Sequence, residues 1–313
     1  MTERWVSLET FKVVSAAGGG RLFWNGLQAV KLRVAIKALD VNLKPVALTQ
    51  TELDSIKLVN HHGGAAIHYQ IPLPGLPRPV SSQHGWDWSH VNPYGYDYVP
   101  TSSQQLANEE ASVKDRYTYY VDLFVRTVRQ EPLTVSLTVN RDDGEQFDSR
   151  GLIEGDMTIT PLRPTTYTVD KYRFEVVHTM ELGQWGKLDY IPLVLNDNGV
   201  NIEFRSISVS PVGVGYHAGS STVTRVGMVS GYMGPGINSI IYPSPRPPGA
   251  PASVTGITPV RGQPALITFR DRWLSPGKVK NATITAIDMY GNSHVLRFRI
   301  VNPERVDGRL ELY

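Results

Sequence analysis

Aromatic side chains with polar neighbours gather between residues 84 and 98, and their chemistry is that of a binding surface. Aromatic rings on a loop can stack on sugar rings or anchor a protein partner, because they bring a large contact area at little entropic cost. Four prolines between Pro72 and Pro79 exclude a central strand just before this stretch. We therefore expect a long surface loop that either binds a ligand or packs on its own domain. Its candidate binding residues are Trp86, Trp88, Tyr94, Tyr96 and Tyr98.

Histidines form a second group that could do chemistry, as metal ligands. His61 and His62 are adjacent, with His68 nearby, but adjacent residues of a strand point to opposite faces. The spacing of His84 and His90 permits a site in the aromatic loop. No short zinc-ligand spacing accompanies any of these histidines. We predict no metal site and no cofactor.

Four carboxylates lie close together in the sequence and could supply the oxygen ligands that calcium prefers. Their spacing differs from that of an EF-hand loop, and a glycosidase pair would need a partner distant in sequence that no pattern identifies. The dipeptide Asp143-Gly144 favours a tight turn, so we expect a charged hairpin tip here. The four residues are Asp142, Asp143, Glu145 and Asp148.

Short catalytic motifs are missing from the sequence. It has no Gly-x-Ser-x-Gly elbow, no phosphate-binding or dinucleotide glycine motif, and no His-Glu-x-x-His. It also has no cysteine, which excludes disulfides, thiolate metal sites and cysteine nucleophiles together. We predict a non-enzymatic protein, although an all-β fold can host catalysis without a short motif.

A nearly uncharged segment runs from Ser206 to Pro245, where Arg225 is the only formal charge. Small polar residues alternate there with Val and Ile. The pattern fits a buried core, a subunit interface depleted of charge, or a membrane-inserting β-hairpin. Pro211 and several glycines argue against a long regular hairpin. The candidate assembly or insertion residues are Ile207, Val209, Val212, Val214, Tyr216, Val226, Met228 and Tyr232.

Strands dominate the elements that must position these groups. Apolar residues alternate with polar ones from Val30 to Lys37, from Tyr117 to Val125 and from Leu133 to Val139, and we expect the last two runs to form a hairpin. A capping box at Thr49–Glu52 predicts one short helix, and Gln104–Lys114 could form another. Further strands are expected at Tyr172–His178, Leu188–Leu195, Val200–Val209, Ala265–Phe269, Thr283–Ile287 and Val295–Val301, with a turn at Asn196–Gly199. The predicted fold class is all-β, built from antiparallel β-sandwich units of jelly-roll or immunoglobulin-like type.

Prolines suggest where the domains divide. Five prolines between residues 243 and 252 favour a stiff linker, with a softer boundary near Thr160–Pro164. We predict a sandwich at 1–160, a second β unit at 161–242, and a small immunoglobulin-like domain at 253–313. Within the last, Ala286–Asn292 resembles the hairpin of bacterial immunoglobulin-like repeats, in which an alanine-x-aspartate and a glycine-asparagine turn precede the last strand. That resemblance implies a sandwich.

The net charge and the composition of the chain narrow the classes of partner that this protein could bind. The formal net charge of +2 and the scattered Lys and Arg do not favour nucleic acid. No signal peptide and no apolar run long enough for a spanning helix are visible, so we expect a soluble protein made in the cytoplasm and released, if at all, by a non-classical route. The predicted function is a non-enzymatic binding or structural component of a bacterial or phage extracellular assembly, with copies of itself or other proteins as partners. The alternatives are a β-pore-forming toxin and a carbohydrate-binding lectin.

Overall fold

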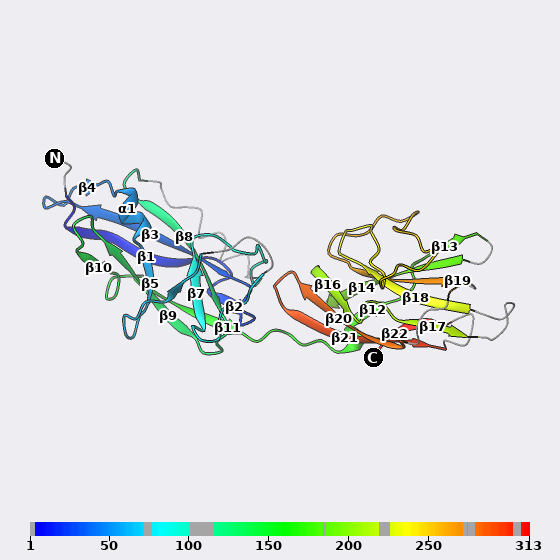
Figure 1. Ribbon diagram of the computed structural model, residues 1–313. Helices are drawn as coiled ribbons and strands as arrows, with labels where there is room; N and C mark the ends of the chain where they lie inside the picture. The colour runs from blue at the N-terminus through cyan, green and yellow to red at the C-terminus, as the bar shows by residue number, and fades with distance from the viewer. Residues whose placement is uncertain are drawn as a thin grey trace. The chain divides into compact units, whose positions relative to one another are not determined.

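The chain folds into two units. The computed structural model describes residues 4–71, 77–100, 115–183, 186–218, 226–271, 274, 279–302 and 308–313. Contacts divide the chain into Met1–Pro164 and Thr165–Tyr313, and strands account for nearly all the regular structure of both (Figure 1). The predicted all-β class is therefore confirmed.

The N-terminal unit has a first sheet in which β3 lies between β1 and β8. The β3 residues Val30, Leu32, Val34 and Ile36 are fully buried, whereas Lys31 and Arg33 point outward and pair with Asp122 on the neighbouring strand. This is the alternation that the sequence predicts for a half-buried strand. In sheet order the strands are β1 (Ser7–Ala17), β3 (Val30–Leu39), β8 (Tyr119–Thr127), β7 (Trp86–Ser89) and β6 (His68–Tyr69), and β4 (Pro45–Val46) pairs with β3.

A second sheet packs against the first. Its strands in order are β10 (Gln146–Asp148), β9 (Leu133–Asn140), β11 (Asp156–Leu162) and β2 (Arg21–Phe23), and β5 (Lys57–Asn60) pairs with β9. One core cluster draws residues from both sheets, including Leu32 and Val125 from the first and Leu58 and Leu137 from the second. Most strand pairs are antiparallel; β2 with β11 and β6 with β7 are parallel. The unit is a β-sandwich.

The predicted hairpin between the runs at 117–125 and 133–139 is wrong. β8 is hydrogen-bonded between β3 and β7, whereas β9 is hydrogen-bonded to β5, β10 and β11 in the other sheet. Both runs alternate because each buries one face in the same core, so the pattern marks the strands without showing which sheet each one joins. The chain between them crosses from one sheet to the other.

The short helix α1 (Gln50–Asp54) confirms the capping box. The Thr49 hydroxyl accepts from the backbone N–H of Glu52, and the Glu52 carboxylate accepts from the backbone N–H of Thr49. Two amide groups that would otherwise lack partners are thereby satisfied. The second predicted helix, at 104–114, lies outside the described residues. No helix in the described ranges is long and apolar enough to span a membrane.

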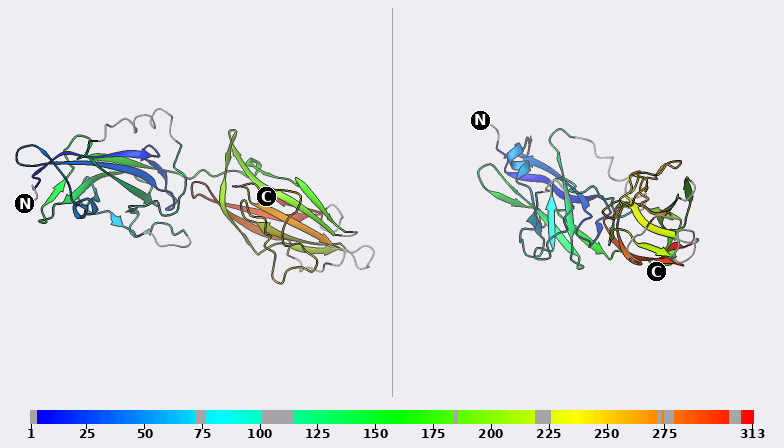
Figure 2. Two further views of the ribbon diagram at one scale, coloured as in Figure 1. Left: turned by 90° about the horizontal axis from the view of Figure 1, so that it is seen from above. Right: turned by 45° about the vertical axis from the view of Figure 1, so that its right-hand side comes forward.

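The C-terminal unit is also built from two sheets, which can be followed in the two views of Figure 2. One core cluster includes Leu193, Met228 and Leu266 from the first sheet and Ile284 and Phe298 from the second. The first sheet contains β12 (Tyr172–Phe174), β13 (His178–Leu182), β14 (Gly186–Asp197), β15 (Val200–Ile202), β19 (Ala265–Asp271), β18 (Val226–Met233) and β17 (Gly215–Ala218). The second, in order, is β16 (Phe204–Ser210), β20 (Asn281–Asp288), β21 (Ser293–Val301) and β22 (Arg309–Leu312), and the short 3-10 helix η1 (Val169–Lys171) precedes β12.

The proline-rich stretch at 243–252 lies inside this unit, which differs from the predicted linker. β19, which follows it in the sequence, is hydrogen-bonded between β14 and β18, so 253–313 is not a separate domain. Tyr242 and Ala250 are buried against Val229 and Phe269 on the sheet face that turns away from the second sheet. The stretch, gold in Figure 1, therefore covers that face as an extra layer. The break between units falls after Pro164, near the softer predicted boundary.

The described part of the uncharged segment contributes several residues to this unit's own interior. β16 belongs to one sheet and β17 and β18 to the other, so the segment is not one hairpin. Val209, Val214 and Met228 are core residues. Ile207, Tyr216 and Tyr232 pack half-buried against them, Val212 is exposed, and the side chain of Val226 lies outside the described set. These positions match the internal-core interpretation of the sequence.

Gly231 of β18 has no room for a side chain, because residues 240–242, which lead into the covering layer, approach it closely. A Cβ atom at Gly231 would lie 2.7 Å from the carbonyl oxygen of Ile241 and 2.9 Å from side-chain atoms of Ile240 and Tyr242. We expect Gly231→Ala to lower the free energy of unfolding of the C-terminal unit by about 1–3 kcal/mol, since backbone must move to admit the methyl group. Urea denaturation followed by circular dichroism would measure this.

Gly63→Ala is the control for that measurement, because nothing lies within 4 Å of a Cβ atom at Gly63. An unchanged unfolding curve for both variants would show that the covering layer does not hold its close contact with β18.

Candidate functional site

A groove of about 1040 Å³ opens at one edge of the N-terminal sandwich. One wall comes from the first sheet, where β6 and β7 lie side by side in parallel register. The other comes from α1, β5 and the first residue of β9. The first wall carries the aromatic residues His68, Tyr69, His84, Trp86, Trp88 and His90, and the second carries Asp54, Ile56, Lys57, Asn60 and Leu133.

The strand β7 corrects the predicted aromatic loop. Trp86–Ser89 is hydrogen-bonded to β8 on one side and β6 on the other, so it lies within the sheet. Trp86 and Trp88 share the face that lines the groove, and alternation sends Asp87 to the opposite face. Trp88 is 3% exposed and belongs to the core, while Trp86 is half-buried. The prolines that argued against a strand stop before β7 begins.

Tyr69 offers an accessible aromatic ring in the groove, with 43% of the residue exposed. Its ring centroid lies 4.8 Å from that of Trp88 and 5.7 Å from that of His90, and the Trp88 and His90 centroids are 5.3 Å apart. The indole N–H of Trp88 donates to the carbonyl oxygen of Ile67 at 3.1 Å, which fixes the indole ring. The aromatic wall is therefore held in place before any ligand binds.

A buried ion pair supports this wall from the other face of the sheet. Arg126 on β8 donates to both oxygens of Asp87, Nε to Oδ1 at 3.0 Å and Nη2 to Oδ2 at 2.7 Å, and both side chains are almost fully buried. The guanidinium also donates to the Gln70 side chain at 2.8 Å and to the Arg78 carbonyl at 3.1 Å. Burial raises the pKa of Asp87, and the Arg126 charge opposes that rise. This one cation joins β8, β7 and the chain on both sides of residues 72–76.

The predicted tyrosines lie apart from the groove. Tyr94 donates its hydroxyl to the Arg78 carbonyl at 3.0 Å, and its ring faces the Arg126 guanidinium at 5.0 Å. Tyr96 is buried, and burial raises the pKa of Tyr98. Tyr96 and Tyr98 line a separate depression that Gly18 also borders. Of the five predicted aromatic residues, the groove therefore brings together Trp86 and Trp88.

The histidines that the sequence offers as metal ligands make different contacts in the structure. A ring nitrogen of His61 forms a hydrogen bond with the Ser136 hydroxyl at 2.8 Å. The rings of His68 and His84 stack at 3.9 Å with 5° between their planes, and His90 lies beside Trp88. Among the described residues, no three His, Asp or Glu side chains are placed so that they could hold a metal ion.

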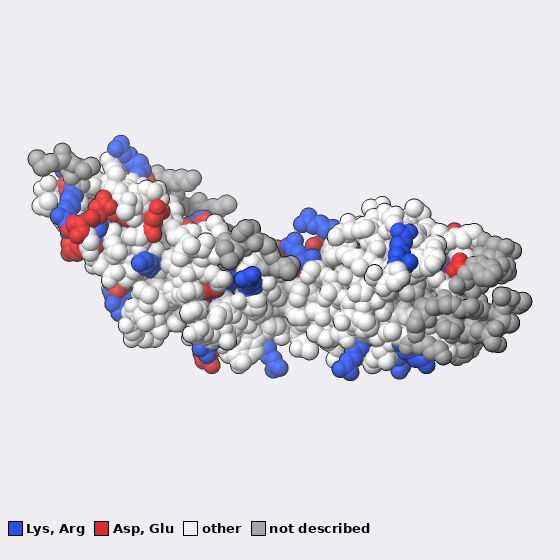
Figure 3. Space-filling model, in the orientation of Figure 1, with Lys and Arg blue, Asp and Glu red and all other residues white. Residues whose placement is uncertain are grey.

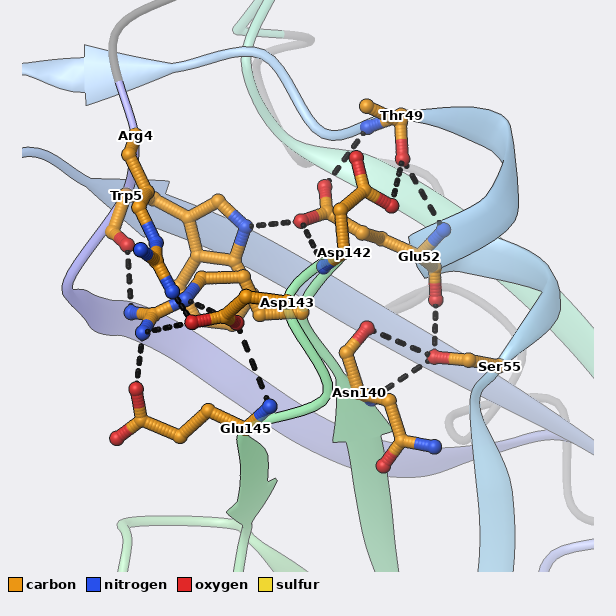
Figure 4. A network of polar contacts seen from close by, with 10 residues as sticks. Arg4, Trp5, Thr49, Glu52, Ser55, Asn140, Asp142, Asp143 and Glu145 are labelled. Carbon is orange, nitrogen blue, oxygen red and sulfur yellow. Dashed lines mark hydrogen bonds and ion pairs between the residues drawn. The ribbon is translucent and has the colours of Figure 1, made fainter.

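The four clustered carboxylates face arginines and amide groups at a hairpin tip. Basic and acidic side chains lie side by side on the face of the N-terminal unit drawn in Figure 3. Arg4 contacts Asp143 (Figure 4). Arg141 donates to both oxygens of Asp143, at 2.9 and 3.0 Å, and also contacts Glu145. Asp148 pairs with Arg150. The charged hairpin tip is therefore confirmed for β9 and β10.

The same network anchors the chain near its start. Glu52 accepts from the Trp5 indole N–H at 2.7 Å, and its Oε1 also accepts from the Asp142 backbone N–H at 3.3 Å (Figure 4). Asp142 in turn accepts from the Thr49 hydroxyl at 3.1 Å. The capping carboxylate of α1 thus ties Trp5 and the hairpin tip together.

Sequence reasoning missed Tyr69 and the second wall of the groove. Tyr69 meets Trp88 through the pairing of β6 with β7, and Ile56 and Asn60 reach the groove from the opposite sheet. No local pattern signals such contacts, since they depend on which strands pair. The sequence marks these histidines as candidate metal ligands, whereas their position in an aromatic wall depends on the same pairing.

Comparison with known proteins adds little to what the structure shows about the fold. No protein-family model matches the sequence, and no curated protein sequence matches it. One similar solved structure is the C-terminal domain of the Streptococcus pyogenes antigen I/II-family protein AspA. It has 10% sequence identity and a TM-score of 0.23, and the match covers 93% of this chain and 97% of that one. A TM-score of this size does not establish a shared fold, so the site rests on the geometry of this chain alone.

Proposed function

We propose that this chain is a non-enzymatic binding protein whose N-terminal unit holds a saccharide in the groove between α1, β5, β6 and β7. The observation that carries the proposal is that exposed Tyr69 and half-buried Trp86 line the same groove. The apolar C–H face of a sugar ring packs well on an aromatic ring that is held in place beforehand.

Polar side chains complete what a saccharide needs. Asn60, Gln83 and Lys57 line the same groove and offer amide and ammonium groups to sugar hydroxyls. A site with mainly apolar walls and a few placed polar groups is the usual form of a small-ligand pocket. The mixture favours a saccharide over a purely apolar ligand, which would leave these polar groups without partners.

A binding role fits the groove better than hydrolysis. Among the described residues that line it, Asp54 is the only carboxylate, and it accepts from the Gln50 side chain at 2.8 Å. Glycoside hydrolysis ordinarily uses two carboxyl groups on either side of the scissile bond. We therefore retain the non-enzymatic assignment.

The C-terminal unit is proposed as a structural module of a larger extracellular assembly. Its first sheet is covered on both faces, by the second sheet and by the proline-rich layer, which suits a rigid spacer. Membrane insertion is less favoured, because β18 would have to leave a sheet in which it is hydrogen-bonded to β17 and β19.

Tyr69→Ala tests the groove. On a glycan array, the wild-type protein should bind a defined set of saccharides, and the variant should bind them about tenfold more weakly, which corresponds to about 1.4 kcal/mol. Tyr120→Ala is the matched control, since Tyr120 is 39% exposed on β8 and does not line the groove. A wild-type protein that binds no saccharide, or a Tyr69→Ala variant that binds equally well, would refute the proposal.

A further inference from the structure

We infer that the saccharide carries an acidic group, a carboxylate, sulfate or phosphate, which binds beside the stacked rings of His68 and His84. The inference rests on the proposed saccharide site and specifies its ligand. It follows from the position of the histidine pair, from a second cavity next to it, and from the balance of charge around both.

The histidine pair stands where the groove meets a smaller cavity. His68 comes from β6, and His84 comes from the turn before β7, where Gly85 N–H donates to the Ser81 carbonyl at 2.8 Å. Both side chains are exposed and line the groove. They also line the smaller cavity, which has a volume of about 260 Å³. A ligand in the groove can therefore place a substituent against both rings.

The smaller cavity is lined by groups that suit an anion. Arg78 is exposed and borders the cavity, together with the hydroxyl-bearing Ser81 and the amide-bearing Gln70. An arginine presents a planar set of donors that matches the oxygens of a carboxylate or a phosphate. The volume is sufficient for one such group.

Charge around the pair favours an acidic ligand. Asp87 borders the smaller cavity, but both of its oxygens already accept from Arg126. On the remaining sides, Arg129 packs against Gly85, and Tyr69 and His90 face the groove. Lys57 and Asp54 lie on the opposite wall. Among the described residues that line the two cavities, Lys57 and Arg78 match Asp54 and Asp87 in number, but Asp87 is already paired with Arg126, so the smaller cavity keeps the positive charge of Arg78.

Imidazole in general changes charge between about pH 5 and 8, which makes pH a test of this site. Two positive charges on rings whose centroids lie 3.9 Å apart would repel each other. An anion beside the rings offsets that repulsion and favours the protonated pair. By linkage, a ligand that binds the protonated form more tightly must bind more tightly as the pH falls through this range.

A first experiment tests the anion site without any saccharide. Sulfate is titrated into the full chain at about pH 5.5 while the histidine ring signals are followed by NMR. The signals of His68 and His84 should shift in a saturable way, and that of His62, which is exposed and lies outside both cavities, should not. Arg78→Gln should weaken sulfate binding severalfold. Equal, non-saturable shifts at all three histidines would overturn the inference.

A second experiment compares uronate oligosaccharides with their neutral methyl esters at about pH 7.5 and 5.5. The acids should bind better than the esters, with affinity about fivefold higher at the lower pH, and the double variant His68→Asn, His84→Asn should lose this gain. His62→Asn serves as the control. Equal binding of acids and esters, with Tyr69 still required, would overturn this inference and leave the saccharide site standing. Saturable sulfate binding with no saccharide bound would refute the saccharide site, and with it the acidic saccharide, and would leave only an anion site beside His68 and His84.

Discussion

Replacing Arg126 with methionine should lower the free energy of unfolding of the N-terminal unit by about 3–5 kcal/mol. The substitution leaves the buried Asp87 carboxylate without the cation that donates to both of its oxygens. It also removes the donors to Gln70 and to the Arg78 carbonyl. Urea denaturation monitored by tryptophan fluorescence would measure the loss, and saccharide binding should weaken as well, because β7 carries Trp86.

Arg33→Met is the matched control. Arg33 also pairs with an aspartate on the neighbouring strand, Asp122 at 2.9 Å, but both side chains are about one-third exposed. An exposed pair of this kind contributes about 0–1 kcal/mol. Similar losses for the two variants would show that burial of the Asp87–Arg126 pair has no special effect.

The pH dependence of the Arg126→Met variant follows from the sign of the Asp87 shift. Burial raises the pKa of Asp87 in the folded protein, and loss of the opposing Arg126 charge raises it further. The folded variant then holds this proton to a higher pH than the unfolded chain does. Its stability should therefore improve relative to wild type as the pH falls toward the ordinary pKa of aspartate, and decline as the pH rises. Adding Asp87→Asn should abolish this trend.

Asp288→Ala should destabilise the C-terminal unit by a similar amount, about 3–5 kcal/mol. One oxygen of Asp288 accepts from the backbone N–H groups of Tyr290 and Asn292, each at 2.8 Å. The other accepts from the Asn292 side chain at 3.1 Å and lies 3.1 Å from a ring nitrogen of His294. Removing the carboxylate leaves several buried donors in the β20–β21 turn without an acceptor.

The network extends from that turn into the first sheet of the same unit. The second ring nitrogen of His294 forms a hydrogen bond with the Tyr172 hydroxyl at 2.8 Å, and all three side chains are buried. Glu311→Ala is the control, because Glu311 lies 3.8 Å from Arg299 in an exposed pair. Thermal unfolding of both variants would decide; a loss for Asp288→Ala no larger than that for the control would contradict the prediction.

Much of the fold could be predicted because most strands bury one face in a single core. The alternation at Val30–Lys37 gave β3, the turn at Asn196–Gly199 joins β14 to β15, and the capping box gave α1. Pairing between distant strands was harder, since β8 and β9 alternate alike but belong to different sheets. The prolines at 243–252 led to the wrong prediction of a linker, because proline breaks a strand equally well in a linker and in a covering layer.

The candidate site was less accessible to prediction. Composition drew attention to Trp86 and Trp88, since such residues are uncommon and suited to binding. It could not show that Trp88 is buried, that the tyrosines lie elsewhere, or that Tyr69 joins the wall. Each of these features depends on which strands pair with β7. Those strands are separated from β7 in the sequence, and no local pattern identifies them as its partners.

The proline-rich layer also bears on how the C-terminal unit avoids joining other sheets. Beyond the end of β17, Tyr232 of β18 exchanges backbone hydrogen bonds with Ile241, which therefore occupies an edge that would otherwise be open. The residues that follow turn over the face of the sheet and include five prolines, and a proline has no N–H to donate to an incoming strand. A segment with the composition of a linker thus acts as a barrier to sheet extension, and so as a protection against aggregation.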